Sequence, residues 1–73
     1  MAKEMAATLP GRVSRLNLRV GDRVLEDEEA LVIEAFKMET PILIPCDGTV
    51  KEVRVKEGDG VDENQILAII EER

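Results

Sequence analysis

A lone lysine between two large apolar side chains is the feature of this sequence with the clearest chemical potential. Lys37 stands between Phe36 and Met38, and Phe36 is the only aromatic residue in the chain. A free lysine has a pKa of about 10.4 and is an ammonium at neutral pH, so it is a poor nucleophile without an activating partner. We therefore expect any covalent chemistry at Lys37 to depend on a second protein.

The other reactive residue types do not form a catalytic or metal-binding set. The chain has no histidine and one cysteine, Cys46, which excludes thiolate and imidazole metal sites, His-based triads and a disulfide. Segment 57–64 is acidic and contains glycine, but Val61 interrupts its oxygen ligands, so it predicts a turn and not a calcium loop. This inventory argues against an independent enzyme, and we assign no catalytic residue.

Charge and length limit the partners and the organisation of the chain. A net charge of −6 argues against nucleic acid or an anionic membrane as a partner, because both require clustered cations. The sequence has neither the apolar region of a signal peptide nor a run of about 18 apolar residues, so it predicts a cytoplasmic protein without membrane insertion. A chain of 73 residues is short for one domain, and we expect a single domain over residues 1–73.

The sequence contains an internal repeat at an offset of 37 residues, without gaps. Each half has a glycine, a strand-like run, a Gly-Asp turn, an acidic turn and a second strand-like run, with aliphatic residues filling the runs. No helix is predicted. The paired positions are Gly11 and Gly48, Val13 and Val50, Leu16 and Val53, Leu18 and Val55, Gly21 and Gly58, Asp22 and Asp59, Val24 and Val61, Glu26 and Glu63, and Glu34 and Glu71.

The apolar pattern of the two halves predicts how they pack. Alternation holds from Leu16 to Val20 but slips by one residue at Val13, and Val50 repeats the slip, which indicates a β-bulge in each half. Two similar β halves with one apolar face each can bury those faces only against one another. The repeat therefore predicts an all-β sandwich or flattened barrel with quasi-two-fold symmetry.

Lys37 lies at the tip of a hairpin if the flanking runs 30–34 and 40–44 are paired strands. Hairpin tips normally contain Asn, Asp or Gly, and this one contains none of them. Either Phe36 and Met38 are exposed and contacted by a partner, or they fold inward and cap the core. Position 74 would be the repeat partner of Lys37, so only one such tip is expected, with both termini at the opposite end.

The tip resembles the attachment motif of the biotinyl domain family, in which the modified lysine normally lies between two methionines. The resemblance covers nearly the whole chain and departs from the family pattern at Phe36, where methionine is usual. It also resembles the shortest family members, which lack a protruding loop. The matching residues are Gly11, Val13, Glu34, Ala35, Lys37, Met38, Glu39, Pro45, Asp47, Gly48, Val50, Lys56, Glu57, Gly58 and Asp59.

The resemblance implies a fold of two four-stranded antiparallel sheets and a carrier function without catalysis. Lys37 would receive biotin covalently from a biotin protein ligase that uses biotinyl-adenylate. Ala35, Phe36 and Met38 would be the flanks that the ligase recognises, with Glu34 and Glu39 as further candidates. A biotin carboxylase would load the carboxyl group, and a carboxyltransferase or decarboxylase would receive it.

Two alternatives to this function stay open. A lipoyl carrier of a 2-oxo acid dehydrogenase-type complex has a similar fold and also modifies a hairpin lysine, with lipoate as the cofactor. Lipoyl carriers typically have an acidic residue before the lysine and a small one after it, which Phe36 and Met38 do not match. The second alternative is an unmodified structural module whose hairpin packs against a partner.

Overall fold

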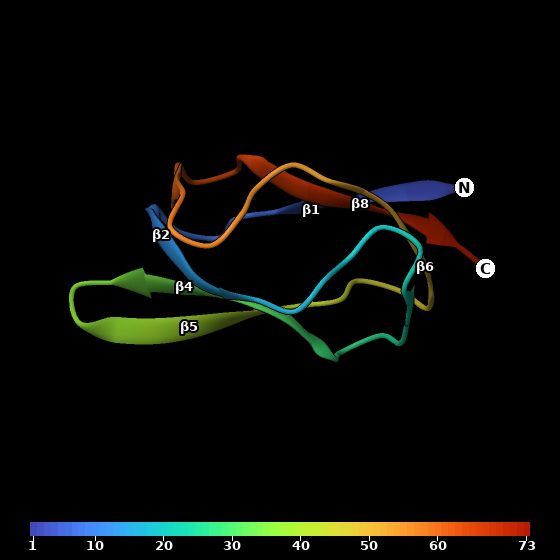
Figure 1. Ribbon diagram of the computed structural model, residues 1–73, viewed down its shortest axis with the longest axis horizontal. Coiled ribbons are helices and arrows are strands. Elements are labelled where there is room, and N and C mark those ends of the chain that lie inside the picture. The colour runs from blue at the N-terminus through green and yellow to red at the C-terminus, as the bar shows by residue number, and fades with distance from the viewer.

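Two four-stranded antiparallel sheets form the protein, and the computed structural model describes residues 1–73 without a helix (Figure 1). One sheet has the strand order β1-β8-β6-β3, and the other has the order β5-β4-β2-β7. The predicted all-β fold with two four-stranded sheets is confirmed. The strands are β1 (Ala2–Ala6), β2 (Gly11–Leu16), β3 (Arg23–Val24), β4 (Glu29–Ala35), β5 (Met38–Leu43), β6 (Gly48–Val53), β7 (Gly60–Val61) and β8 (Ile66–Glu72).

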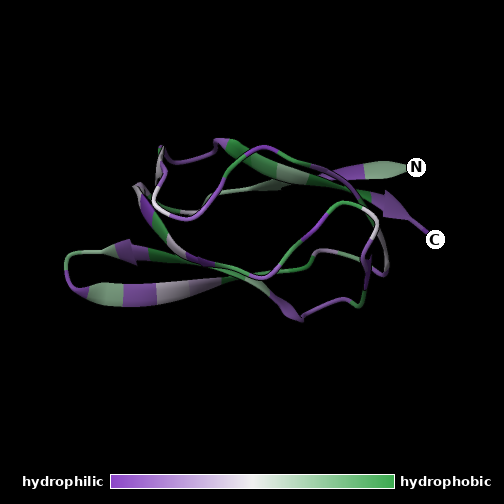
Figure 2. Ribbon diagram, in the orientation of Figure 1, coloured by the Kyte–Doolittle hydropathy of each residue, from purple (hydrophilic) through white to green (hydrophobic).

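The core lies between the two sheets and is almost entirely aliphatic. A single cluster of 17 buried residues contains no polar or charged side chain apart from the thiol of Cys46. Along the strands hydrophobic residues are interspersed with hydrophilic ones, and both kinds also occur in the connecting loops (Figure 2). Full burial of one such aliphatic side chain contributes about 1.5–3 kcal/mol. The largest fully buried side chains are Leu31, Ile33, Ile44, Leu67, Ile70, Val13 and Val50.

The internal repeat is present in the backbone as well as in the sequence. Strands β1 to β4 correspond in order to β5 to β8, and the two sheets have equivalent strand orders. In the first Gly-Asp turn the Arg19 amide donates to Asp22 Oδ2 at 3.1 Å, and in the second the Lys56 amide donates to Asp59 Oδ2 at 3.0 Å. These carboxylates satisfy backbone donors, which is why aspartate suits both turns.

The two acidic turns are also equivalent. The Leu25 amide donates to Glu28 Oε1 at 2.7 Å, and the Asp62 amide donates to Gln65 Oε1 at 2.9 Å. Within these turns Asp27 has φ 71° and its repeat partner has φ 69°. That partner is Asn64, and aspartate and asparagine are the non-glycine residues that tolerate this conformation best. Segment 57–64 forms turns and β7, and no group of three Asp, Glu or Cys side chains is arranged to hold a metal ion.

Both predicted β-bulges are confirmed. In the pairing of β2 with β4, Val13 lies opposite Ile33 and Arg15 lies opposite Val32, so Ser14 is the extra residue. In the pairing of β6 with β8 the register shifts between residues 50 and 52 in the same way. Each bulge bends the strand, so that the aliphatic residues before it and after it in the sequence both face the core.

The β4–β5 hairpin extends to one end of the molecule, and both termini lie at the other end (Figure 1). The molecule measures 35 × 17 × 17 Å, with the hairpin and the termini separated along its long direction. This arrangement agrees with the prediction from the repeat. No helix is available to cross a membrane. The fold thus presents one hairpin at an end free of chain termini.

Candidate functional site

The tip of the β4–β5 hairpin is a two-residue turn made by Phe36 and Lys37. Strand β4 ends at Ala35 and β5 begins at Met38, and these two residues form the last pair of the ladder. Phe36 has φ 52° and Lys37 has φ 63°. Positive φ at both central residues is the requirement of a type I′ turn, whose twist matches that of the strands. For a residue with a side chain this conformation costs roughly 1–2 kcal/mol.

The apolar residues beside Lys37 point away from the core. Phe36 is 94% exposed and Met38 is 69% exposed, and Lys37 is exposed between them. The alternative in which Phe36 and Met38 fold inward is therefore wrong. The hairpin extends past the last core layer, which ends at Ile33, so side chains at the tip have no apolar surface to cover.

Two carboxylates lie directly below the tip. Glu34 and Glu39 are opposite one another in the β4–β5 pairing, so their side chains share one face of the sheet. Arg12 of β2 is the partner of Glu34 on the other side, and its guanidinium lies 3.3 Å from Glu34 Oε1. Glu39, on the edge strand, has no ion pair or hydrogen bond with another side chain. The pairing with Arg12 could not be read from the sequence, because it depends on the bulged register of β2.

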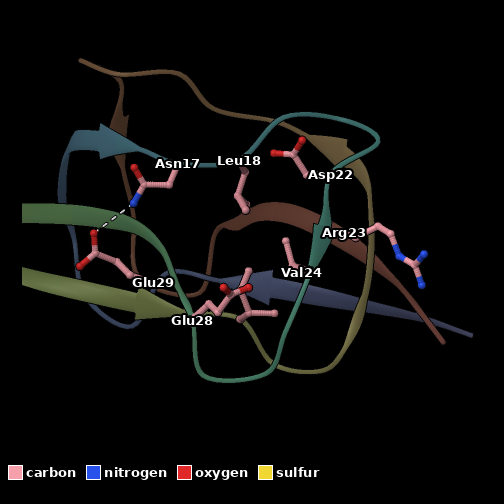
Figure 3. Close-up of a pocket in the computed structure, with 8 residues that line it drawn as sticks. Asn17, Leu18, Asp22, Arg23, Val24, Glu28 and Glu29 are labelled. Carbon is pink, nitrogen blue, oxygen red and sulfur yellow. Dashed lines mark hydrogen bonds between the residues drawn. The ribbon is translucent and has the colours of Figure 1, made fainter.

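No cavity encloses Lys37. The larger of two surface depressions, of about 490 Å³, has a floor of Leu18, Val24 and Ile44 and lies away from residues 34–39. Figure 3 shows its polar rim, where Asn17 Nδ2 donates to Glu29 Oε2 at 3.0 Å. The second depression, between β1 and β5, also excludes the tip. Lys37 therefore lies on the open surface and not in a pocket of its own.

Cys46 is a core residue. It is 6% exposed and belongs to the aliphatic cluster. Burial raises the pKa of the Cys46 thiol, and the carboxylate of Glu72 raises it further. A protonated, buried thiol is unreactive, so Cys46 acts as a small packed residue of the core.

We predict that Phe36→Asn stabilises the domain and slows modification of Lys37. Asparagine tolerates positive φ, and the exposed Phe36 ring contributes little to the core, so the free energy of unfolding should rise by about 0.5–1 kcal/mol. Urea denaturation measures the first effect, and the initial rate of ligase-catalysed modification measures the second. Unchanged or lower stability would show that the turn is not strained at Phe36.

A flattened barrel with one exposed lysine at a hairpin tip is an arrangement suited to a carrier domain. The sequence model of the biotin/lipoyl family, described as "Biotin-requiring enzyme", matches residues 3–70. The chain belongs to this family. Within it, the chain is a domain of the biotin carboxyl carrier type, similar to domains of carboxylases.

Three relatives illustrate the range, from a protein of similar length to much longer carboxylases. The biotin/lipoyl attachment protein of Bacillus subtilis is 37% identical over 59 residues, which is 81% of each chain. The pyruvate carboxylase of Staphylococcus aureus is 39% identical over 67 residues, 92% of this chain but 6% of that protein. The crystal structure of the Kluyveromyces lactis urea carboxylase superposes over 96% of this chain and 6% of that one, with a TM-score of 0.87 and 28% identity. The chain thus spans a small part of the carboxylases that it matches.

Lipoyl-type proteins are also similar to the chain. The dihydrolipoyllysine-residue acetyltransferase component of the Mycoplasma genitalium pyruvate dehydrogenase complex is 36% identical over 63 residues, 86% of this chain and 16% of that protein. Overall identity therefore does not separate biotin from lipoate.

Proposed function

We propose that residues 1–73 act as one biotin carboxyl carrier domain, biotinylated on Lys37 and without catalysis of its own. The observation that carries the proposal is the exposed turn in which Phe36 and Met38 flank Lys37. Large apolar residues on both sides of the lysine favour biotin over lipoate by resemblance to the biotinyl motif. The absence of any neighbouring ion pair at Lys37 leaves its Nζ atom accessible for amide formation.

The chemistry at Lys37 is an acyl transfer that a biotin protein ligase would catalyse. The Nζ atom forms a bond to the carboxyl carbon of biotinyl-adenylate, the bond to the adenylate oxygen breaks, and AMP leaves with that electron pair. The lysine ammonium gives up two protons and becomes a neutral amide. Phe36 and Met38 would pack against the ligase and, with Ala35, hold the turn so that Nζ points into the ligase active site. Glu34 and Glu39 would flank this contact.

The fold would then serve as a rigid base for a mobile arm. Biotin attached at Lys37 supplies a site that accepts and donates a carboxyl group. The tip lies at the end of the molecule opposite the termini, so the arm can enter partner active sites without interference from the chain ends (Figure 1). Tethering also raises the concentration of the carried group near each partner. The partners would be a biotin carboxylase and a carboxyltransferase or decarboxylase.

We place this function in the cytoplasm, where the ATP that activates biotin is available. The proposed partners do not include nucleic acid, because the net charge of −6 opposes binding to phosphates.

Parallel ligase reactions test the proposal and its alternatives. The chain is incubated with a biotin protein ligase, biotin and ATP, and separately with a lipoate ligase, lipoate and ATP, and its intact mass is measured. We expect the mass of one biotinyl group to be added in the first reaction and nothing in the second. Lipoylation alone would support the lipoyl carrier of a 2-oxo acid dehydrogenase-type complex. No modification in either reaction would support the unmodified structural module.

A further inference from the structure

Three charged side chains form a row across the sheet immediately below the hairpin tip, and we call Arg12, Glu34 and Glu39 the charged row. They are successive partners across β2, β4 and β5, so they lie on the same face. Arg12 neutralises Glu34 at 3.3 Å, which leaves Glu39 as the one free carboxylate on the exposed edge. Like charges directly opposite one another destabilise a strand pair, so the arrangement of Glu34 and Glu39 needs an explanation.

The second half of the repeat shows that the fold does not require the charged row. The equivalent row contains Thr49, Glu71 and Ala2, which are partners in the same order across β6, β8 and β1. It has one carboxylate, and that carboxylate lies 3.4 Å from the N-terminal ammonium. The opposed carboxylates and the arginine occur only at the end of the molecule that bears Lys37. The two halves therefore differ where partners would meet the tip.

Modification changes the charge balance of the tip. Before modification the two cations, Arg12 and Lys37, balance the two anions, Glu34 and Glu39. Amide formation at Nζ removes the charge of Lys37 and leaves the tip one unit negative, with Glu39 as the unpaired group. The exposed Phe36 and Met38 beside it provide apolar contact area in both states.

We propose that the charged row makes the tip sensitive to its own modification, so that a partner with a basic surface binds the modified domain in preference to the unmodified one. This inference rests on the proposed function, and the partner is the biotin carboxylase. An enzyme that binds ATP and bicarbonate, both anions, carries positive potential around its active site, and that potential is complementary to the modified tip. Arg12 acts as a positioning residue, because its ion pair with Glu34 fixes that carboxylate and sets the net charge of the tip.

Competition for a biotin carboxylase tests the proposal. The probe is the purified biotin carboxylase subunit of a bacterial carboxylase, which carboxylates the biotinylated wild-type chain while non-biotinylated chains compete. At low ionic strength we expect Lys37→Gln, which removes the lysine charge as the amide does, to inhibit about two- to fivefold more strongly than the unmodified chain. Glu39→Gln should inhibit more weakly than the unmodified wild-type chain, by a similar factor. Arg12→Thr introduces the residue found at the repeat partner, Thr49, and should inhibit more strongly than the unmodified wild-type chain.

Glu71→Gln is the matched control, because it removes one carboxylate at the opposite end of the molecule, and it should leave inhibition unchanged. Melting temperatures establish that each variant is folded, and the tip effects should fade as added salt screens them. If the tip variants inhibit like Glu71→Gln while the biotinylated chain is carboxylated, the charged row has no role in recognition and the proposed function stands. If the biotinylated chain is not carboxylated, the proposed function fails and this inference fails with it.

Discussion

We expect replacement of Lys37 with arginine to abolish the proposed biotinylation and to leave the fold intact. The arginine guanidinium stays protonated and cannot form the amide, whereas its length and charge are close to those of lysine. The side chain at position 37 is exposed and contributes no packing, so the free energy of unfolding should change by less than about 0.5 kcal/mol. Intact mass after incubation with biotin protein ligase, biotin and ATP measures the loss, and urea denaturation measures the stability.

Lys51→Arg is the matched control for this prediction. Lys51 is an exposed lysine on β6, in a strand interior and not in a turn, so its replacement should not affect the mass gained. A biotinyl group on the Lys37→Arg chain would assign the attachment to a different lysine. Unfolding of Lys37→Arg would instead give Lys37 a structural role that its exposure does not predict.

Gly48→Ala should be among the most destabilising single-methyl additions to this chain. Gly48 begins β6, an inner strand, and a Cβ atom there would overlap the backbone carbonyl of Glu71 and lie 3.1 Å from Ile70 Cγ2. Backbone atoms of paired strands cannot move apart locally without loss of the ladder. We expect the free energy of unfolding to fall by about 2–3 kcal/mol. That is a large part of the roughly 4–11 kcal/mol usual for a domain of this size.

Gly60→Ala provides the comparison for Gly48→Ala. Gly60 also begins a strand, but the nearest heavy atom to a Cβ there is the carbonyl oxygen of Gly11 at 4.0 Å. Its free energy of unfolding should therefore stay within about 0.5 kcal/mol of the wild type. Equal urea midpoints for the two variants would mean that β6 can shift away from β8, contrary to the close approach seen at Gly48.

The repeat allowed much of the fold to be predicted from the sequence, because each feature appeared twice. The slip in alternation at Val13 and Val50 predicted both bulges, and the matching Gly-Asp pairs predicted both turns. The position of Lys37 at the tip followed from the apolar runs on either side. These features depend on local residue types and their spacing, and both can be read directly from a sequence.

Other features depended on contacts that the sequence does not state. The sequence leaves the exposure of Phe36 and Met38 open, because an apolar residue near a turn packs inward or outward according to how far the hairpin extends past the core. The ion pair of Arg12 with Glu34 required the register of β2 on β4. The reason for glycine at position 48 is a close approach between strands that are separated in the chain. Each of these is a property of tertiary structure.

The quasi-two-fold symmetry has a consequence for how the chain could be closed into a ring. The Glu72 amide donates to the carbonyl oxygen of Met1 at 2.6 Å, so β8 and β1 remain paired up to the chain ends. By the repeat, Arg73 stands where Phe36 stands at the tip, and one further residue would occupy the position of Lys37. A single inserted residue would thus join the termini through a second two-residue hairpin. If that residue were lysine, the circular chain would present a lysine at a hairpin tip at each end of one barrel.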